Sequence, residues 1–259
     1  MLLEVVTEQF QAVVALRYPL ERVPDEWEIP EVPVPESVPH DVLVEYLKAL
    51  LVAWAAHADS SILVARNLAV RWVEQRPAVG IDPDVAVIEP APPDWRQLSS
   101  LKLWEPGCHA PRLAVEVVSH GHPYKDYSVL PERYAAMGVG ELWVLDPGRF
   151  GPRRLGGPHL IQQWTRDDDG TFVRRYAGEG PVHSSAVDAW VRSDPERGVA
   201  LSSDAGGNQR WLTQADQSDL ARDTAEAQRV AEAQRRTELE AQNERLAEKL
   251  RALGVDPEA

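Results

Sequence analysis

The sequence predicts an α/β fold, in which helices flank a sheet of buried strands and one long helix follows at the C-terminal end. Three short segments carry the sheet prediction, and they are residues 83–88, 113–119 and 141–147. Each is rich in Val, Leu and Ile and is bounded by Gly or Pro, a pattern typical of buried strands. The long helix is predicted for residues 218–253, which contain neither Pro nor Gly and are rich in good helix formers.

Two further helices belong with this sheet. Residues 130–137 are predicted to be helical, with Pro131 in the first turn. This helix joins the second strand to the third by short links, and such a crossover connects parallel neighbours. Residues 41–57 form the other helix, because their apolar side chains recur three and four positions apart. His40 or Asp41 is expected to cap its N-terminal end.

Additional strands are expected on either side of this centre. Residues 61–74 partly alternate between apolar and polar positions, with a bulge or turn at residues 66–67. Residues 160–166 and 171–176 are predicted to form a hairpin around an acidic turn. Residues 89–111 contain five prolines and two tryptophans, and we expect a loop there that serves as a functional edge, a lid or a packed wall.

Composition divides the chain into four parts. Residues 1–39 form an N-terminal arm, with a short helix predicted for residues 2–17 and six prolines in its second half that favour an extended path over the surface. Residues 40–201 form the α/β domain and residues 202–217 a polar linker. Residues 218–259 form the helical tail.

The helical tail offers an apolar seam for self-association. Leu239, Leu246 and Leu253 lie seven residues apart, with Leu250 between the last two, which gives about two heptads. A coiled coil through these leucines would make the protein a homo-oligomer. A solvated single helix is the alternative, because the same seam is formed by Ala and polar residues farther upstream.

The charge balance argues against tight, nonspecific binding of nucleic acid. The formal net charge is −14, and only four lysines are present. Nonspecific binding rests largely on neutralising phosphates, so an enzyme acting on nucleic acid would need a local basic patch or a metal-bridged encounter. We expect no membrane partner, because no uncharged apolar run reaches the length of a membrane span. The lone Cys108 excludes an internal disulfide and fits a cytoplasmic protein.

Two carboxylates interrupt the apolar strands. Asp84 lies in the first predicted strand and Glu116 in the second. A charge in such a place is costly unless it is paired or binds a metal. On neighbouring strands, the two carboxylates could hold one divalent cation. The structural alternative gives each acid its own ion pair, with Arg66, Arg71 or Arg112 as the candidate partner.

These acids belong to a larger spaced set. Pro83-Asp84 is followed by Glu116 within Val-Glu-Val-Val-Ser, then by Asp126, then by Tyr134 and the block Gly-Glu-Leu-Trp-Val-Leu-Asp-Pro that ends at residue 147. The set resembles the PD-(D/E)XK nuclease superfamily and, more closely, its Uma-type restriction endonuclease family. The resemblance covers roughly residues 39–200 and implies a restriction-endonuclease-like core, which is a mixed sheet flanked by helices.

The resemblance also implies a metal-dependent endonuclease that hydrolyses nucleic-acid phosphodiesters. Asp84 and Glu116 match the two metal-binding acids of the family and would hold Mg²⁺ or Mn²⁺. Mg²⁺ keeps several waters and needs only one or two carboxylates. The bound ion would lower the pKa of an attacking water and stabilise the charge that builds on the phosphate.

The basic residue of the family has no direct match. Val118 stands where the superfamily usually has one, two residues after the metal-binding glutamate, and Leu130 stands where Uma-type families carry a helix lysine. Lys125 is the candidate catalytic residue in its place, and a surface lysine without a role is the alternative. His120 and His122 lie close enough in sequence to contribute.

These departures leave two functions open. The first is an active metal-dependent endonuclease. The second is a catalytically inactive, nuclease-like module for binding or scaffolding, assembled through the helical tail. The acidic charge and the leucine at position 130 favour the second function.

Overall fold

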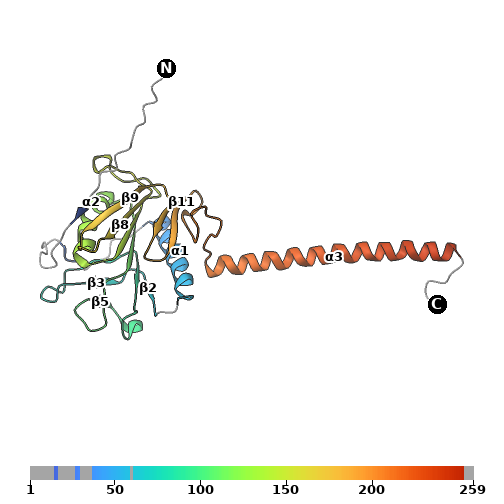
Figure 1. Cartoon of the computed structure of the whole chain (residues 1–259), viewed down its shortest axis with the longest axis horizontal. Helices are drawn as coiled ribbons and strands as arrows, with labels where there is room; N and C mark the ends of the chain where they lie inside the picture. Colours follow the sequence, from blue (N-terminus) through green and yellow to red (C-terminus); the bar gives the residue numbers. More distant parts are fainter. Residues whose placement is uncertain (1–14, 17–26, 30–36, 59–60, 254–259) are drawn as a thin grey trace, which may run out of the picture. The chain divides into compact units, whose positions relative to one another are not determined.

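A computed structural model describes residues 15–16, 27–29, 37–58 and 61–253 of the chain. The chain divides into two compact units, Met1–Trp211 and Leu212–Ala259. The first unit holds all the strands and two of the α-helices, and the second holds one long α-helix (Figure 1). This arrangement confirms the predicted mixed α/β class with a long C-terminal helix.

The centre of the first unit is a seven-stranded mixed sheet with the strand order β1-β9-β8-β7-β6-β4-β2. All neighbours are antiparallel except β6 and β7, which are parallel and joined by helix α2, so the predicted crossover is confirmed. The strands are β1 Ala15–Leu16, β2 Leu63–Ala65, β4 Val85–Ile88, β6 Leu113–Val117, β7 Glu141–Leu145, β8 Ile161–Arg166 and β9 Phe172–Gly178.

Two smaller sheets and two main helices complete this unit. One small sheet has the order β10-β11-β12, and the other pairs β3 with β5 in parallel. Short 3₁₀ helices cover Trp95–Gln97 and Arg153–Leu155. The remaining elements are α1 Val38–Ala55, α2 Pro123–Met137, β3 Ala69–Arg71, β5 Ser100–Lys102, β10 Val182–Ser184, β11 Ala189–Asp194 and β12 Gly198–Ser202.

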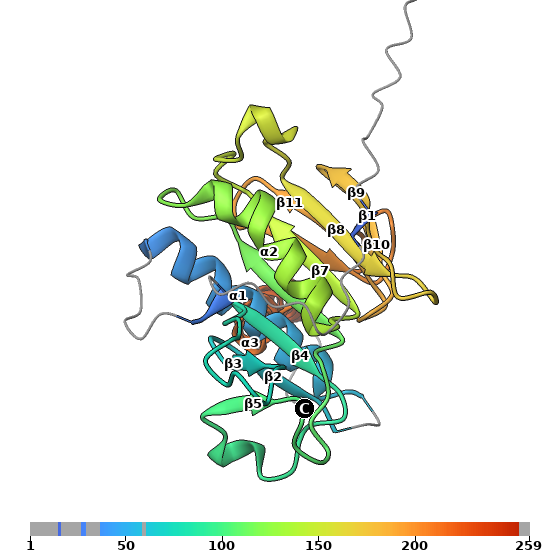
Figure 2. The ribbon, with the colours of Figure 1, turned by 90° about the vertical axis from the view of Figure 1, so that its left-hand side faces the viewer.

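Alternation along the central strands separates two apolar cores. In β6, Val115 joins the core that contains the buried face of α1, whereas Ala114 joins the core that contains α2. In β7, Trp143 belongs to the core on the α1 side and Leu142 to the core on the α2 side. Successive side chains of a strand point to opposite faces, so α1 and α2 cover opposite faces of the sheet, as Figure 2 shows. The strands are buried on both faces, which explains their continuous apolar sequence.

Several predicted boundaries are corrected. Helix α2 begins at Pro123 rather than at residue 130, and Pro131 therefore lies in its interior instead of its first turn. Both prolines suit a first turn, and the burial of Tyr127 and Leu130 on the sheet favours the earlier start. The expected loop at residues 89–111 contains strand β5. The predicted hairpin is confirmed as β8 and β9.

Part of the N-terminal arm can be placed. Most of the helix predicted for residues 2–17 lies outside the described residues, but its end is wrong, because Ala15–Leu16 pair with β9 as a strand. The backbone at residues 27–29 is bonded to the body, with Ile29 N donating to Ala78 O at 3.0 Å and Gly80 N donating to Trp27 O at 3.2 Å. Trp27 is buried, as expected of an arm that runs along the surface.

The second unit is the single helix α3, Gln214–Ala252 (Figure 1). It begins four residues before the predicted start, because Thr213 and Asp216 cap each other. Asp216 N donates to Thr213 Oγ1 at 3.1 Å, and Thr213 N donates to Asp216 Oδ2 at 3.0 Å, which is a capping-box arrangement. In the part of the chain that the structure describes, no helix is both long enough and apolar enough to cross a bilayer.

Gly140 offers a test of how β7 is positioned. A Cβ at Gly140 would lie 2.9 Å from the carbonyl oxygen of Arg112, which is backbone and cannot move aside. We expect Gly140→Ala to lower the free energy of unfolding by about 1–3 kcal/mol, a typical cost of overpacking. At Gly121 an added Cβ meets nothing within 4 Å. Urea unfolding should show Gly121→Ala unchanged within error, and equal stability of the two variants would contradict this packing.

Candidate metal-binding site

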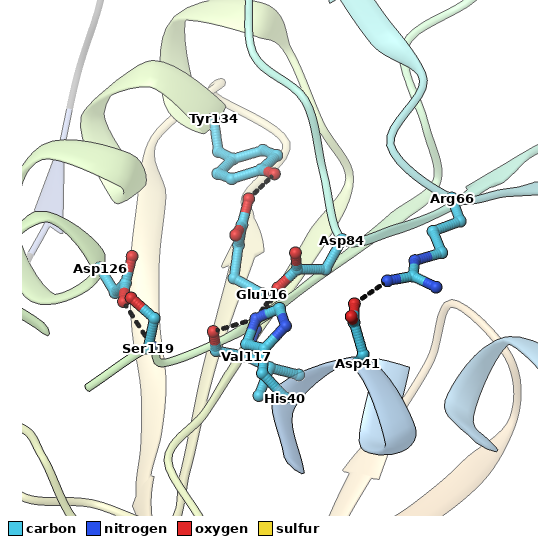
Figure 3. Close-up of polar contacts among 9 residues, drawn as sticks. All are labelled: His40, Asp41, Arg66, Asp84, Glu116, Val117, Ser119, Asp126 and Tyr134. Carbon is cyan, nitrogen blue, oxygen red and sulfur yellow. Dashed lines mark hydrogen bonds and ion pairs between the residues drawn. The ribbon is translucent and has the colours of Figure 1, made fainter. Parts of the chain in front are cut away.

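The sheet register brings the two predicted acids together. Strand β4 pairs with β6 so that Val85 lies opposite Val115, and one step further along the register sets Asp84 opposite Glu116. Opposed residues of antiparallel strands have their side chains on the same face. Figure 3 shows both carboxylates on that face, and both residues are buried. The two predicted strands are neighbours, with Glu116 inside β6 and Asp84 one residue before β4.

Helix α2 covers the acid pair. Asp126, Leu130 and Tyr134 are spaced by four residues, so they share one side of the helix. The Tyr134 hydroxyl donates to Glu116 Oε1, and Ser119 N donates to Asp126 Oδ2 at 3.3 Å (Figure 3). Leu130 lies between these two polar contacts and is 1% exposed. A lysine at this position would therefore be directed toward the acids.

His40 reaches the site from α1 and is the residue that sequence reasoning missed. Its Nε2 lies 3.0 Å from Val117 O and 3.2 Å from Asp84 Oδ2 (Figure 3). Val117 N also donates to Asp84 Oδ2, at 2.7 Å.

The capping role expected for His40 or Asp41 is wrong. The N-cap position is Ser37, and His40 is buried inside the first turn of α1. A sequence signal did exist, because His40 continues the buried stripe of α1 at the helical spacing of Leu43 and Leu47.

The candidate arginines bind elsewhere. Arg66 pairs with Asp41 and Glu45, and Arg112 pairs with Glu89. Arg71 donates to the carbonyl oxygen of Pro77. Among the described residues, none of the three arginines forms an ion pair with Asp84 or Glu116, so the structural alternative of separate ion pairs is not what the fold adopts.

Two other buried acids, Glu141 and Asp146, each accept several hydrogen bonds and serve as a comparison. Glu141 accepts hydrogen bonds from Trp143 Nε1 at 2.6 Å, from Gln163 Nε2 at 2.8 Å and from Ala186 N at 3.2 Å. Asp146 accepts three, at 2.8 Å each, from the Tyr127 hydroxyl and from the backbone N–H groups of residues 150 and 151. Each of these acids faces donors. By contrast, Glu116 accepts one hydrogen bond within the described residues and faces another carboxylate.

This arrangement makes the charged forms of Glu116 and Asp126 unfavourable. Burial raises the pKa of Glu116 well above its usual 4.5, and the charge of Asp84 raises it further. Burial also raises the pKa of Asp126, to about 7, against opposing contributions from Lys125 and from the Ser119 N–H group. Burial and the charge of Glu116 together raise the pKa of Tyr134, which therefore stays a hydrogen-bond donor.

Lys125 acts electrostatically on the acids of the site. It is exposed in the first turn of α2, and its charge lowers the pKa values of both Glu116 and Asp126. His120 and His122 are exposed, and the ring of His120 lies edge-on to Phe150 at 5.1 Å between centroids. Val118 is buried in the core that α2 covers and supplies no charge.

Asp84 and Glu116 are the residues of this site that could hold a divalent cation. Within the described ranges, no group of three or more His, Cys, Asp or Glu side chains is placed to hold a metal ion. Two carboxylates suffice for Mg²⁺, which retains several waters. Asp84 and Glu116 supply two oxygens on one face of the sheet, and a cation between them would relieve the repulsion that raises the pKa of Glu116.

With the geometry described, the class of protein can be stated. Residues 16–150, more than half of the chain, match the Uma2 family, which is described as "Putative restriction endonuclease". The chain belongs to this family, and the family resemblance expected from the sequence is confirmed. The family match includes the residues of the site described above.

A solved structure is also similar. It is titled as a putative nuclease belonging to DUF820 from Anabaena variabilis ATCC 29413, with 12% sequence identity and a TM-score of 0.42. The alignment covers 60% of this chain and 76% of that one. A likeness this distant carries no argument about the site. A search of curated proteins found no match.

Asp126 should impose a pH dependence on stability. The pKa of Asp126 is about 7 in the folded state, whereas the ordinary pKa of an aspartate is 3.8. Between these pH values the folded state binds more protons than the unfolded state, so stability falls as pH rises. In metal-free buffer containing EDTA, the wild type should lose up to about 4 kcal/mol more than Asp126→Asn between pH 4 and 7.

Urea unfolding at a series of pH values measures this difference. Asp223→Asn, at an exposed position of α3, serves as the control and should follow the wild type. Parallel curves for the wild type and Asp126→Asn would contradict the raised pKa of Asp126.

Proposed function

We propose that the chain hydrolyses phosphodiester bonds of nucleic acid with a divalent metal ion, Mg²⁺ or Mn²⁺, held by Asp84 and Glu116. The observation that carries this proposal is the opposition of two buried carboxylates with few internal donors. Perturbed acids of this kind cluster at functional sites. Membership of the Uma2 family supports the same reaction class.

The surrounding residues would hold the two acids in place. His40 Nε2 and Val117 N both contact Asp84 Oδ2, which leaves Oδ1 for a ligand. The Tyr134 hydroxyl holds Glu116 Oε1 and leaves Oε2. A bound divalent ion supplies Lewis-acid chemistry, in that it lowers the pKa of a water and stabilises charge on the phosphate.

Lys125 is proposed to add positive charge at the edge of the site. Its influence on the pKa values of Glu116 and Asp126 supports a position within electrostatic reach of a bound phosphate. It stands in for the helix lysine that the family resemblance places at position 130. Because Lys125 is exposed, solvent weakens its field, and we expect slow turnover.

Cleavage of a supercoiled plasmid and of a labelled oligonucleotide, with and without Mn²⁺, tests the proposal. Glu116→Gln and Asp84→Asn should each reduce the rate by at least about 100-fold, because each removes charge that the metal needs. Asp41→Asn is the matched control, since Asp41 pairs with Arg66 outside the site. Equal background cleavage in all four proteins would remove the enzymatic proposal.

The same proteins distinguish an inactive module from an enzyme that lacks its usual lysine. Mn²⁺ at about 100 times its dissociation constant should stabilise the wild type by about 2.7 kcal/mol and should not stabilise Glu116→Gln. Such binding without cleavage would favour the scaffolding alternative.

Cleavage gained in Leu130→Lys would show that the site lacks only the lysine of the family, because position 130 lies on the same side of the helix as Asp126 and Tyr134.

We also propose that α3 pairs with α3 of a second copy. Leu239 and Leu246 are about half exposed although they are large and apolar, and Leu253 is more exposed still. Asn243 falls in the same seam, at the heptad position where a buried asparagine favours two parallel helices. The seam is thus an apolar stripe on an otherwise polar helix, which is the surface that a second helix would cover.

Light scattering on the full chain tests this pairing. The wild type should have the mass of a dimer, and Leu246→Asp should shift it toward the monomer because the charge would be buried in the seam. Val230→Asp is a matched control, since Val230 is 52% exposed against 50% for Leu246 but lies outside the seam. A wild type with the mass of a monomer, or equal masses in all three proteins, would contradict the pairing.

A further inference from the structure

The first unit contains a cavity of about 550 Å³ whose wall includes His40 and Val117. Its walls come from the first half of α1, the end of β6, the turn after β7 and the turn between β11 and β12. The lining is mostly apolar, and its largest side chains are aromatic: Tyr46, His120 and Phe150. Its volume is within the usual range of ligand cavities, which is roughly 300–1,000 Å³.

The cavity and the candidate metal site share two residues. His40 and Val117 line the cavity, and the same two residues contact Asp84 Oδ2. A molecule in the cavity would therefore contact the residues that hold Asp84.

The rim of the cavity suits a flat, uncharged ring. The guanidinium of Arg197 lies 4.7 Å over the ring of Tyr46, and His120 lies edge-on to Phe150. Glu196 stands next to Arg197, so the charges on this rim offset each other and provide no net attraction for a phosphate. Phe150 is 39% exposed, so part of its side chain is open to solvent.

We infer that this cavity receives the nucleobase of an unpaired nucleotide whose neighbouring phosphate reaches Asp84 and Glu116. The inference rests on the proposed nuclease function and specifies its substrate as a single strand or an extruded nucleotide. A paired and stacked nucleobase cannot enter a cavity walled on several sides. The chain has a net charge of −14, so contacts with phosphates contribute little binding energy. Aromatic stacking on a nucleobase does not depend on positive charge and would supply that energy instead.

Binding is measured separately from cleavage, by fluorescence anisotropy in EDTA. The probes are a labelled single-stranded DNA octamer, the RNA octamer of the same sequence, their duplex forms, and a DNA octamer with abasic internal positions. The wild type should bind a single strand more tightly than the matching duplex or the abasic strand. Comparison of the DNA and RNA octamers identifies which of the two strands the cavity takes.

Three variants locate the binding to the cavity. Phe150→Ala should weaken binding of the single strand at least about fivefold, the lower end of what one nucleobase stack contributes, and Phe150→Tyr should restore it. Val42→Asp adds a negative charge at an exposed position of the lining and should weaken binding without disturbing the fold. Trp95→Ala is the matched control, because Trp95 is 38% exposed but lies outside the cavity.

The outcomes separate this inference from the nuclease proposal. Equal affinity for the intact and abasic strands, a preference for duplex, or unchanged binding in Phe150→Ala would overturn the assignment of the cavity, even if Mn²⁺-dependent cleavage is observed. The expected binding pattern without any cleavage would support the cavity and remove the enzymatic claim.

Discussion

Repulsion between two buried carboxylates is the interaction on which the rest of the site depends. Asp84 and Glu116 are opposed in the register of β4 and β6, and helix α2 contacts Glu116 through the Tyr134 hydroxyl. Burial and the facing charge both disfavour the ionised state of Glu116. In the proposed function a divalent cation would offset this cost, and the surrounding residues would hold the two acids in place for it.

Helices α1 and α2 both contact the acid pair near the end of β6. The crossover from β6 to β7 places Tyr134 over Glu116, while α1, on the opposite face of the sheet, brings His40 to Asp84 and Val117. The cavity begins at the same strand end, where Val117 and His40 form part of its wall. Substrate binding and metal binding would thus be adjacent because both use the residues that close the sheet at this point.

Local sequence predicted the strands, the crossover and the two acids, because each leaves a short-range signal. A carboxylate inside a run of Val and Leu is conspicuous for the same reason that it is costly. The opposition of Asp84 and Glu116 depends on which strands pair and in which register, and no local pattern specifies that choice. The contrast with Glu141 and Asp146 also needed the fold, since some of their donors come from distant segments, namely Gln163 and Ala186 for Glu141 and Tyr127 for Asp146.

The misplaced features have a common cause. His40 suited both a helix end and a buried stripe, and only the packing of α1 on the sheet selects the second role. Pro131 suited a first turn, but the helix begins earlier, at Pro123, because the residues before Pro131 pack against the sheet. In each case a local preference was outweighed by burial against a part of the chain far away in sequence, which stabilises helices more than propensity does.

Calorimetric titration with Mn²⁺ in buffers of different ionisation enthalpy tests the central claim most directly. One ion per chain should bind, and at a pH below the raised pKa of Glu116 its binding should release a proton, because Glu116 must lose its proton to become a ligand. Glu116→Gln should abolish both the binding and the proton release. Binding of equal strength in Glu116→Gln, or binding of Mn²⁺ to the wild type with no proton released, would contradict the account.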